Sequence, residues 1–286
     1  PIDPSRAIFR LALHSPDEFG ISQLDFSQVK GGINWDLANR DFTIDAMAIP
    51  FVQSNTPSSN WKVLDPTGGL DDLKQQSIRM THPNVFKADP IRVLRATRLA
   101  SHLGFKIEQE TYRITQRDSF LLTQSSPERI RDEFLGILSQ PNLENSLGEL
   151  NMNSALETIF PELSECKGIT QPIEHYWDVY DHSIQTTAMV EAILNPHYRK
   201  DDEIGRAIPW KPWLDGYFSE EACDGHNRST ILKLAGLLHD VAKPETKSIQ
   251  PDGKVRFLGH SLIGADKSGN ILSRLRFSNR GITMIQ

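Results

Sequence analysis

Residues 39–48 read NRDFTIDAMA, and the interpretation of the rest of the chain depends on this stretch. It places a guanidinium, a carboxylate and an aromatic ring in consecutive positions, at Arg40, Asp41 and Phe42. Arg40 offers a planar fork of donors that fits phosphate oxygens. Asp41 can accept a hydrogen bond from a sugar hydroxyl or hold Arg40 in place. The alternative is an ordinary amphipathic helix start that carries a surface ion pair.

A second stretch, DPTGGLDDL at residues 65–73, reads as a turn followed by a helix. Its paired glycines allow positive φ angles and close backbone approach. Asp71 and Asp72 suit the first turn of a helix, where acidic side chains interact favourably with the helix dipole. We expect this segment to be mainly architectural.

A third stretch, ADPIRVLRATRLASHLGF, predicts a helix over residues 90–103. Asp89 is suited to the N-cap, a proline follows at the first helical position, and a glycine ends the helix. Arg92, Arg95 and Arg98 recur every third residue and share one broad face. A capped surface helix would explain Asp89, but it would not explain the three arginines together.

In this order and spacing, the three stretches resemble the class II tRNA nucleotidyltransferase and bacterial poly(A) polymerase family. That family usually shows RRDFTINAMA, then DPxGGxxDL, then EDPxRxLRxxRFAxxLGF. The resemblance covers roughly residues 20–140. It implies an enzyme that transfers nucleotides from ATP or CTP to the 3′ end of a tRNA, with a poly(A) polymerase as the alternative. Whether C, A or both are added stays open.

The resemblance also implies a nucleotide site built from charged side chains of these stretches. Asp89 and Arg92 match the family's base-reading pair, in which a carboxylate accepts from an exocyclic amine and a guanidinium donates to the base edge. Asp45 stands where the family has Asn, and Ala88 where it has Glu. The nucleotide-binding residues expected are Arg40, Asp41, Asp45, Asp89, Arg92, Arg95 and Arg98.

Catalysis in this family implies two Mg²⁺ ions held by carboxylates. Residues 7–13 and 24–27 read as short strands, and Asp25 occupies the place of an acidic strand residue that faces the metal site. A solvent-facing strand residue is the alternative. The family's first motif, GGxxRD with a following DxD, is absent from the 286 residues and would precede Pro1. We therefore expect a fragment, cut at both ends, that is inactive in transfer by itself.

From residue 142 onward the pattern is helical and resembles HD-type metal domains. His182, the His239–Asp240 pair and His260 follow the order H…HD…H, beside apolar helices expected at residues 184–194, 231–241 and 258–263. Such a set suits a divalent metal within a bundle, whereas a lone histidine there is usually a core residue. Asp266 is a weak candidate for the last ligand. The segment 195–228 is expected to be a long loop.

Composition and charge distribution add two observations about the chain. Hydrophobic residues make up 38% and charged residues 24% of the chain, as in ordinary globular proteins. The net charge is −6, yet residues 75–140 hold ten Lys and Arg against seven Asp and Glu, so this segment is +3 and the remainder −9. A local phosphate-tracking surface or a solvated helix face would both explain the basic segment.

These observations predict an α+β chain with three parts. Residues 1–75 form part of a DNA polymerase β-like nucleotidyltransferase head, residues 76–140 a helical neck that recognises the base, and residues 141–286 a helical HD domain that is incomplete at its C-terminus. Cys166 and Cys223 are too few for a disulfide scaffold and indicate a cytoplasmic protein. No apolar run approaches the ~20 residues of a membrane span. A metal-dependent phosphohydrolase and an RNA-binding remnant remain as alternative functions.

Overall fold

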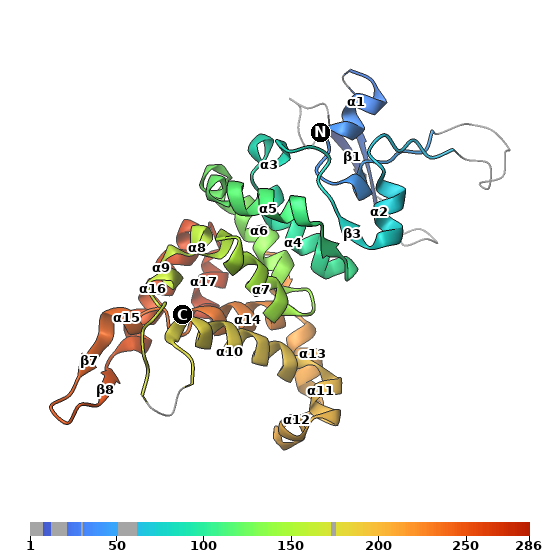
Figure 1. Cartoon of the computed structure of the whole chain (residues 1–286). Helices are drawn as coiled ribbons and strands as arrows, with labels where there is room; N and C mark the ends of the chain where they lie inside the picture. The colour runs from blue at the N-terminus through green and yellow to red at the C-terminus, as the bar shows by residue number, and fades with distance from the viewer. Residues whose placement is uncertain (1–7, 13–21, 30, 51–61, 173–175) are drawn as a thin grey trace.

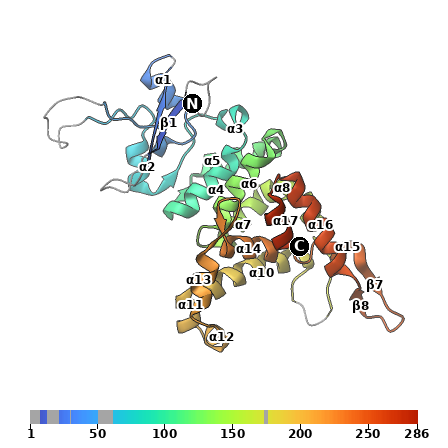
Figure 2. The same ribbon diagram turned by 180° about the vertical axis from the view of Figure 1, so that it is seen from behind.

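The computed structural model describes residues 8–12, 22–29, 31–50, 62–172 and 176–286. The chain runs from a small N-terminal part with a two-stranded ribbon, through a middle group of helices, into a C-terminal helical bundle (Figure 1). Seen from behind, the N-terminal part again lies at one end of the molecule, with the middle helices between it and the bundle (Figure 2).

The N-terminal part begins with the two strands that the sequence predicted. β1 (Ile8–Ala12) pairs antiparallel with β2 (Gln23–Ser27), and this register places Arg10 opposite Asp25. α1 (Ile33–Ala38) and α2 (Gly69–Gln75) follow. The alternative for residues 39–48, an amphipathic helix start, does not form, since this stretch contains only a 3₁₀ turn, Thr43–Asp45. Asp45 Oδ1 accepts from the Phe42 amide at 3.1 Å, which closes the turn, and the chain then becomes extended.

The middle of the chain is helical apart from two short parallel strands. Its elements are β3 (Ser77–Ile78), α3 (Val85–Ala88), α4 (Arg92–Leu103), β4 (Lys106–Ile107), α5 (Gln109–Asp118), the 3₁₀ segment η3 (Ser119–Gln124), α6 (Pro127–Leu138), α7 (Leu143–Met152), α8 (Ala155–Ile159) and α9 (Pro161–Ser164). α4 packs against α6 and α7. Gly104 ends α4 in the left-handed conformation, as predicted.

The start of α4 differs from the sequence prediction. The helix begins at Arg92, and Asp89 has an extended backbone with φ −153° and ψ 96° at the end of α3. The Asp89 side chain does not cap α4, because both of its oxygens accept hydrogen bonds from Arg129 on α6. A contact between two helices therefore replaces the local cap.

The C-terminal part is a bundle built around α10 and α14, which pack along each other. Its elements are α10 (Val179–Leu194), α11 (Pro196–Asp201), α12 (Glu203–Ala207), α13 (Trp213–Ser219), β5 (Glu221–Cys223), β6 (His226–Asn227), α14 (Arg228–Leu238), α15 (Lys243–Thr246), β7 (Lys247–Ile249), β8 (Val255–Phe257), α16 (His260–Arg274) and α17 (Asn279–Ile285). The long loop predicted for residues 195–228 is wrong, because three short helices and a hairpin fill this segment.

One continuous hydrophobic core joins the three parts. It starts at Phe42 and Phe86 near the N-terminal part, whose ring centroids lie 6.4 Å apart. Phe134 of α6 and Phe160 meet edge to face at 4.9 Å in the middle of the molecule. The core then extends to Leu234 and the other buried side chains of α14. The side chains that form the site described below therefore rest on one packed scaffold.

The DPTGG turn generates a stability prediction. Gly68 and Gly69 donate their amides to Asp65 Oδ1 at 2.9 and 2.7 Å, and a Cβ on Gly69 would lie 2.1 Å from the Thr43 carbonyl oxygen. We expect Gly69→Ala to lower the free energy of unfolding by about 1–3 kcal/mol in urea titrations, because backbone must move to accept the methyl group.

Gly148 of α7 provides the matched control. A Cβ there meets no atom within 4 Å, so Gly148→Ala should raise the free energy of unfolding by about 0.5–1 kcal/mol through reduced backbone entropy. Equal effects of the two substitutions would contradict the close approach of Gly69 to Thr43.

Candidate nucleotide site and metal centre

An ion-pair network joins residues 39–48 to the arginine helix α4. Arg95 Nη1 lies 2.7 Å from Asp41 Oδ2, and Arg95 Nε lies 2.9 Å from Glu133 Oε1 on α6. The other oxygen of Glu133 accepts from Arg98 Nε at 2.6 Å. Two carboxylates therefore hold two of the predicted arginines at the junction between the N-terminal part and the middle helices. We call Asp41, Arg95, Glu133 and Arg98 the junction network.

Asp41 and Asp45 lie close together and titrate differently. Burial and then the Asp41 charge raise the pKa of Asp45 to about 7. Burial acts in the same direction on Asp41, but Arg95 outweighs it and lowers the pKa of Asp41 below its usual value. A protonated Asp45 can donate a hydrogen bond to the Asp41 carboxylate. Asp45 can therefore act as a donor, as the amide of the usual Asn can.

Arg40 does not pair with Asp41. Its Nε lies 3.3 Å from Asp36 Oδ2, and its Nη1 donates to the Asp45 carbonyl at 3.3 Å. The interpretation of Asp41 as the partner of Arg40 is therefore wrong, because Arg95 occupies Asp41. The Arg40 side chain remains 46% exposed, so its guanidinium is accessible to a phosphate from solution.

Asp89 and Arg92 have separate protein partners. Both oxygens of Asp89 accept from Arg129, at 2.9 and 2.6 Å. Arg92 Nη1 donates to the Val85 carbonyl at 3.4 Å. Burial, followed by the Arg92 charge, lowers the pKa of His82, which places the guanidinium near that imidazole. Each Asp89 oxygen keeps a further lone pair for a base edge.

Asp25 lies on the exposed β1–β2 ribbon. Arg10 Nε and Nη2 donate to its two oxygens at 2.6 and 2.7 Å. The hydrogen bonds from Arg10 lower the pKa of Asp25 below its usual value. Asp25 therefore fits a Mg²⁺ ligand poorly in this arrangement, because a guanidinium already occupies both oxygens.

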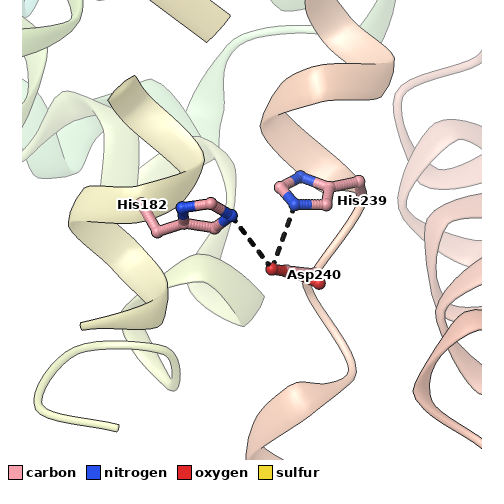
Figure 3. Close-up of side chains that lie close together, drawn as sticks. All are labelled: His182, His239 and Asp240. Carbon is pink, nitrogen blue, oxygen red and sulfur yellow. Dashed lines mark ion pairs between the residues drawn. The ribbon is translucent and has the colours of Figure 1, made fainter. Parts of the chain in front are cut away.

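The predicted metal residues converge in the bundle. His182 projects from α10 and the His239–Asp240 pair follows the end of α14 (Figure 3). One ligand atom from each of these three residues lies within 4.8 Å of the others. His239 Nε2 and His182 Nε2 are 3.0 and 3.5 Å from Asp240 Oδ2, while His260 Nε2 is 3.7 Å from Asp240 Oδ1. We call these four residues the histidine–aspartate cluster.

Hydrogen bonds and charges around the cluster orient its ligand atoms. His239 Nδ1 lies 2.8 Å from the Gly236 carbonyl and His260 Nδ1 lies 2.7 Å from the Phe257 carbonyl, which leaves both Nε2 atoms facing Asp240. Burial opposes the charge on Asp240, but His239 and Lys243 lower its pKa to about 2. Burial likewise acts against the charge on His239, yet Asp240 raises the pKa of His239 above its usual value. Metal-binding histidines commonly donate their other ring N–H to a backbone carbonyl in this way.

The sequence reasoning missed three charged residues of these sites. Glu133 bridges two arginines, Arg129 holds Asp89, and Lys243 Nζ lies 2.7 Å from Asp240 Oδ2. The three-residue spacing from Asp240 to Lys243 was a usable signal for that pair. Asp266 is exposed on α16 and lies outside the group of ligand atoms found among the described residues.

Two family profiles match the chain. The profile described as "Poly A polymerase head domain" matches residues 7–79, and "Probable RNA and SrmB- binding site of polymerase A" matches residues 104–167. The resemblance to the class II tRNA nucleotidyltransferase and poly(A) polymerase family is confirmed. The first matched segment carries the 39–48 stretch, and the second carries Glu133 and Arg129.

Curated relatives in this family are similar along most of the chain. An A-adding tRNA nucleotidyltransferase from Deinococcus radiodurans is 30% identical over 282 residues, which is 96% of this chain and 55% of the relative. A CC-adding tRNA nucleotidyltransferase from Thermus thermophilus is 28% identical over 287 residues, which is 97% of this chain and 55% of the relative. The chain thus spans about half the length of the curated relatives it matches.

Solved structures of the same family share the fold. A tRNA nucleotidyltransferase complexed with a primer tRNA and an incoming ATP analog is 25% identical, with a TM-score of 0.57 over 82% of this chain and 58% of that chain. A CCA-adding enzyme with ATP has a TM-score of 0.57 at 19% identity and covers 99% of this chain and 52% of that chain. These likenesses support the α+β architecture.

The Asp41–Asp45 pair generates a pH prediction. The folded pKa of Asp45, about 7, exceeds the usual value of about 3.9 for an unfolded Asp, so the folded state binds a proton that the unfolded state releases. Stability should therefore fall as the pH rises from 4 to 7. Asp45→Asn should remove this loss of unfolding free energy, which amounts to about 1.4 kcal/mol for each pH unit by which the pKa of Asp45 is raised.

Urea unfolding at pH 5 and pH 8 measures the effect. The gain in unfolding free energy from Asp45→Asn should be larger at pH 8 than at pH 5. Asp71→Asn, which changes a largely exposed carboxylate on α2, serves as the control and should behave alike at both pH values. If the unfolding free energies of the parent and of Asp45→Asn change with pH in the same way, the raised pKa of Asp45 is contradicted.

Proposed function

We propose that this protein acts as a tRNA nucleotidyltransferase that adds C, A or both to a tRNA 3′ end, with ATP and CTP as substrates. The junction network carries the proposal, since Arg95 joins α4 to Asp41 of the NRDFTIDAMA segment and so brings the two predicted nucleotide-binding stretches together. The names of the curated relatives and of the structure with primer tRNA support the same reaction. A poly(A) polymerase is the alternative within the family.

Five of the seven expected nucleotide-binding residues have a proposed role. The exposed guanidinium of Arg40 binds a phosphate of the incoming nucleotide. Asp89 and Arg92 read the base edge, and Arg129 holds the Asp89 carboxylate in orientation. Arg95 and Arg98 are positioning residues, because Glu133 accepts from the Nε atoms of both and Asp41 accepts from Arg95 Nη1. Mg²⁺ would neutralise the triphosphate and the attacking oxygen in such a reaction.

We assign the parts of the chain accordingly. Residues 1–75 correspond to the nucleotidyltransferase head, residues 76–140 to the base-recognising neck and residues 141–286 to the helical HD domain. Cys166 and Cys223 are both free and buried, which suits the reducing cytoplasm. Within the described residues, every helix is too short or too polar to cross a lipid bilayer.

Base reading by Asp89 can be tested in the complete gene product. We expect Asp89→Asn to lower kcat/KM for the preferred nucleotide about 5- to 150-fold, the equivalent of about 1–3 kcal/mol for one lost base contact. Incorporation of ATP, CTP, GTP and UTP into a tRNA that lacks its 3′ CCA is the measurement. An amide would disturb the acceptor pattern while retaining the side-chain shape.

Glu110→Gln supplies the control for Asp89→Asn. Glu110 is likewise bonded through both oxygens to an arginine, Arg113, at 2.7 and 2.8 Å, but on the exposed surface of α5. Glu110→Gln should leave the incorporation rates of all four nucleotides unchanged. An unaltered nucleotide preference in Asp89→Asn would show that Asp89 only joins α3 to α6.

A second candidate function is a metal-dependent phosphohydrolase in the C-terminal bundle, and the histidine–aspartate cluster favours it. Three imidazole nitrogens around one buried carboxylate suit a divalent transition metal. The donors His182, His239, Asp240 and His260 fit such an ion, which would supply an activated water for phosphate ester cleavage. The Lys243 ammonium competes for Asp240 Oδ2, so the bound ion must share or displace it.

Metal content tests the cluster directly. Elemental analysis of protein purified without chelator should find about one transition-metal ion per chain. His239→Ala should reduce this content to background, while His197→Ala, which changes an exposed histidine on α11, should retain it. Equal metal content in the parent and His239→Ala would rule out the assignment. Removal of the competing ammonium by Lys243→Met should instead tighten metal binding.

A further inference from the structure

A cavity of about 520 Å³ lies at the C-terminal end of α4. Its walls come from α4, β4, α5 and α7. The rim residues Gly104, Asn142 and Asn145 are exposed, so the cavity is reached from solvent. It shares no lining residue with the junction network or the histidine–aspartate cluster. Its volume falls within the range of small-ligand sites in proteins, about 300–1,000 Å³.

One buried polar group in this cavity lacks a protein partner within the described part of the chain, and a carboxyl group lies near it. The Tyr112 hydroxyl is buried and has no hydrogen-bond partner among the described residues. Burial raises the pKa of Glu149 against the effect of the nearby Thr97 hydroxyl, and burial followed by the Glu149 charge raises the pKa of Tyr112, which places Glu149 and Tyr112 near each other. A buried hydroxyl without a hydrogen-bond partner destabilises the folded state, and a ligand that forms this hydrogen bond removes the cost.

The remaining lining residues restrict the chemistry of the ligand. The Phe105 and Tyr112 side chains provide aromatic surface, and Asn142 and Asn145 place amides at the rim. Lys106 is the single basic residue of the lining and Glu149 the single acidic one, so the cavity does not select a phosphate. A flat ring with hydrogen-bonding edges fits an aromatic wall combined with carboxyl, hydroxyl and amide groups.

The position of the cavity identifies the source of such a ring. All of its lining residues except Ala100 and Ser101 fall within residues 104–167, the segment that matches the RNA-binding profile. Unpaired bases of RNA are recognised by stacking on aromatic side chains and by hydrogen bonds to their edges. A duplex base could not enter, because its edge is already paired.

We propose that this cavity holds one unpaired base of the RNA substrate, distinct from the base of the incoming nucleotide. Glu149 accepts from an exocyclic amine and Tyr112 donates to a ring nitrogen or carbonyl, so adenine, cytosine and guanine fit and uracil, which lacks the amine, does not. The contact anchors the RNA away from the reacting end. This inference rests on the proposed action on RNA.

The experiment measures RNA binding and nucleotide addition separately in the complete gene product. Filter binding with a tRNA that lacks its 3′ CCA, and with the single-stranded oligonucleotides A8 and U8, gives the dissociation constants. Tyr112→Phe and Glu149→Gln should each weaken tRNA and A8 binding about five-fold, as the loss of one hydrogen bond implies. Weak U8 binding should not change. The KM for ATP and kcat at saturating tRNA should stay at the parental values.

Tyr176→Phe is the matched control, because it removes the same hydroxyl from a tyrosine that is 91% exposed. It should bind every probe as the parent does. The inference is overturned if Tyr112→Phe and Glu149→Gln both bind tRNA and A8 with the parental dissociation constants, even if nucleotide addition proceeds. A parent that binds RNA but adds no nucleotide would instead contradict the proposed function, while the pocket variants would still report on the cavity.

Discussion

The Glu133 carboxylate holds two arginines of α4 at once, and the arrangement of the N-terminal half depends on this contact. Arg95 extends the contact to Asp41, so one chain of charges links α6, α4 and the segment that follows α1. The Glu133 and Asp41 side chains are each only 12% exposed. Removal of one member would leave a desolvated charge without its partner, which generally costs more than the pair contributes.

The junction network also determines which charges remain for a ligand. All three arginines pair with a carboxylate, but the Arg40 side chain is 46% exposed against 30% for Arg95 and Arg98, so Arg40 is the more accessible guanidinium for phosphate. The substitution of the family's usual Asn by Asp45 fits the same electrostatic balance. Asp41 keeps its negative charge through Arg95, and burial together with this charge raises the pKa of Asp45 to about 7. A side chain that looks like an added negative charge in the sequence can thus be neutral in the fold.

Asp240 has a comparable role in the bundle. One buried carboxylate faces three imidazoles and the Lys243 ammonium. The lysine balances the carboxylate charge, so the fold does not need a metal to accommodate Asp240. The carbonyls that orient His239 and His260 leave each Nε2 facing Asp240, an orientation that suits a metal as well as an ion pair.

The sequence by itself determined the elements whose signals are local. The β1–β2 ribbon and the α4 segment that ends at Gly104 follow from residue pattern and capping chemistry. The motif order identified the family, and the H…HD…H order predicted side chains that do converge around Asp240. Short 3₁₀ and helical turns, as at Thr43–Asp45 and residues 196–219, lacked a pattern long enough to predict.

Only the tertiary structure decided the partners of the charges. Asp41 pairs with Arg95, 54 residues away in sequence, and Asp89 pairs with Arg129, 40 residues away. The adjacent charged residues in the sequence therefore did not predict these partners. An ion pair forms where packing brings opposite charges into a common low-dielectric site, and that position depends on how α4, α6 and the N-terminal part pack together. The sequence therefore determined which charged groups the site contains, and the packing of these helices determined which of them are paired and which face a ligand.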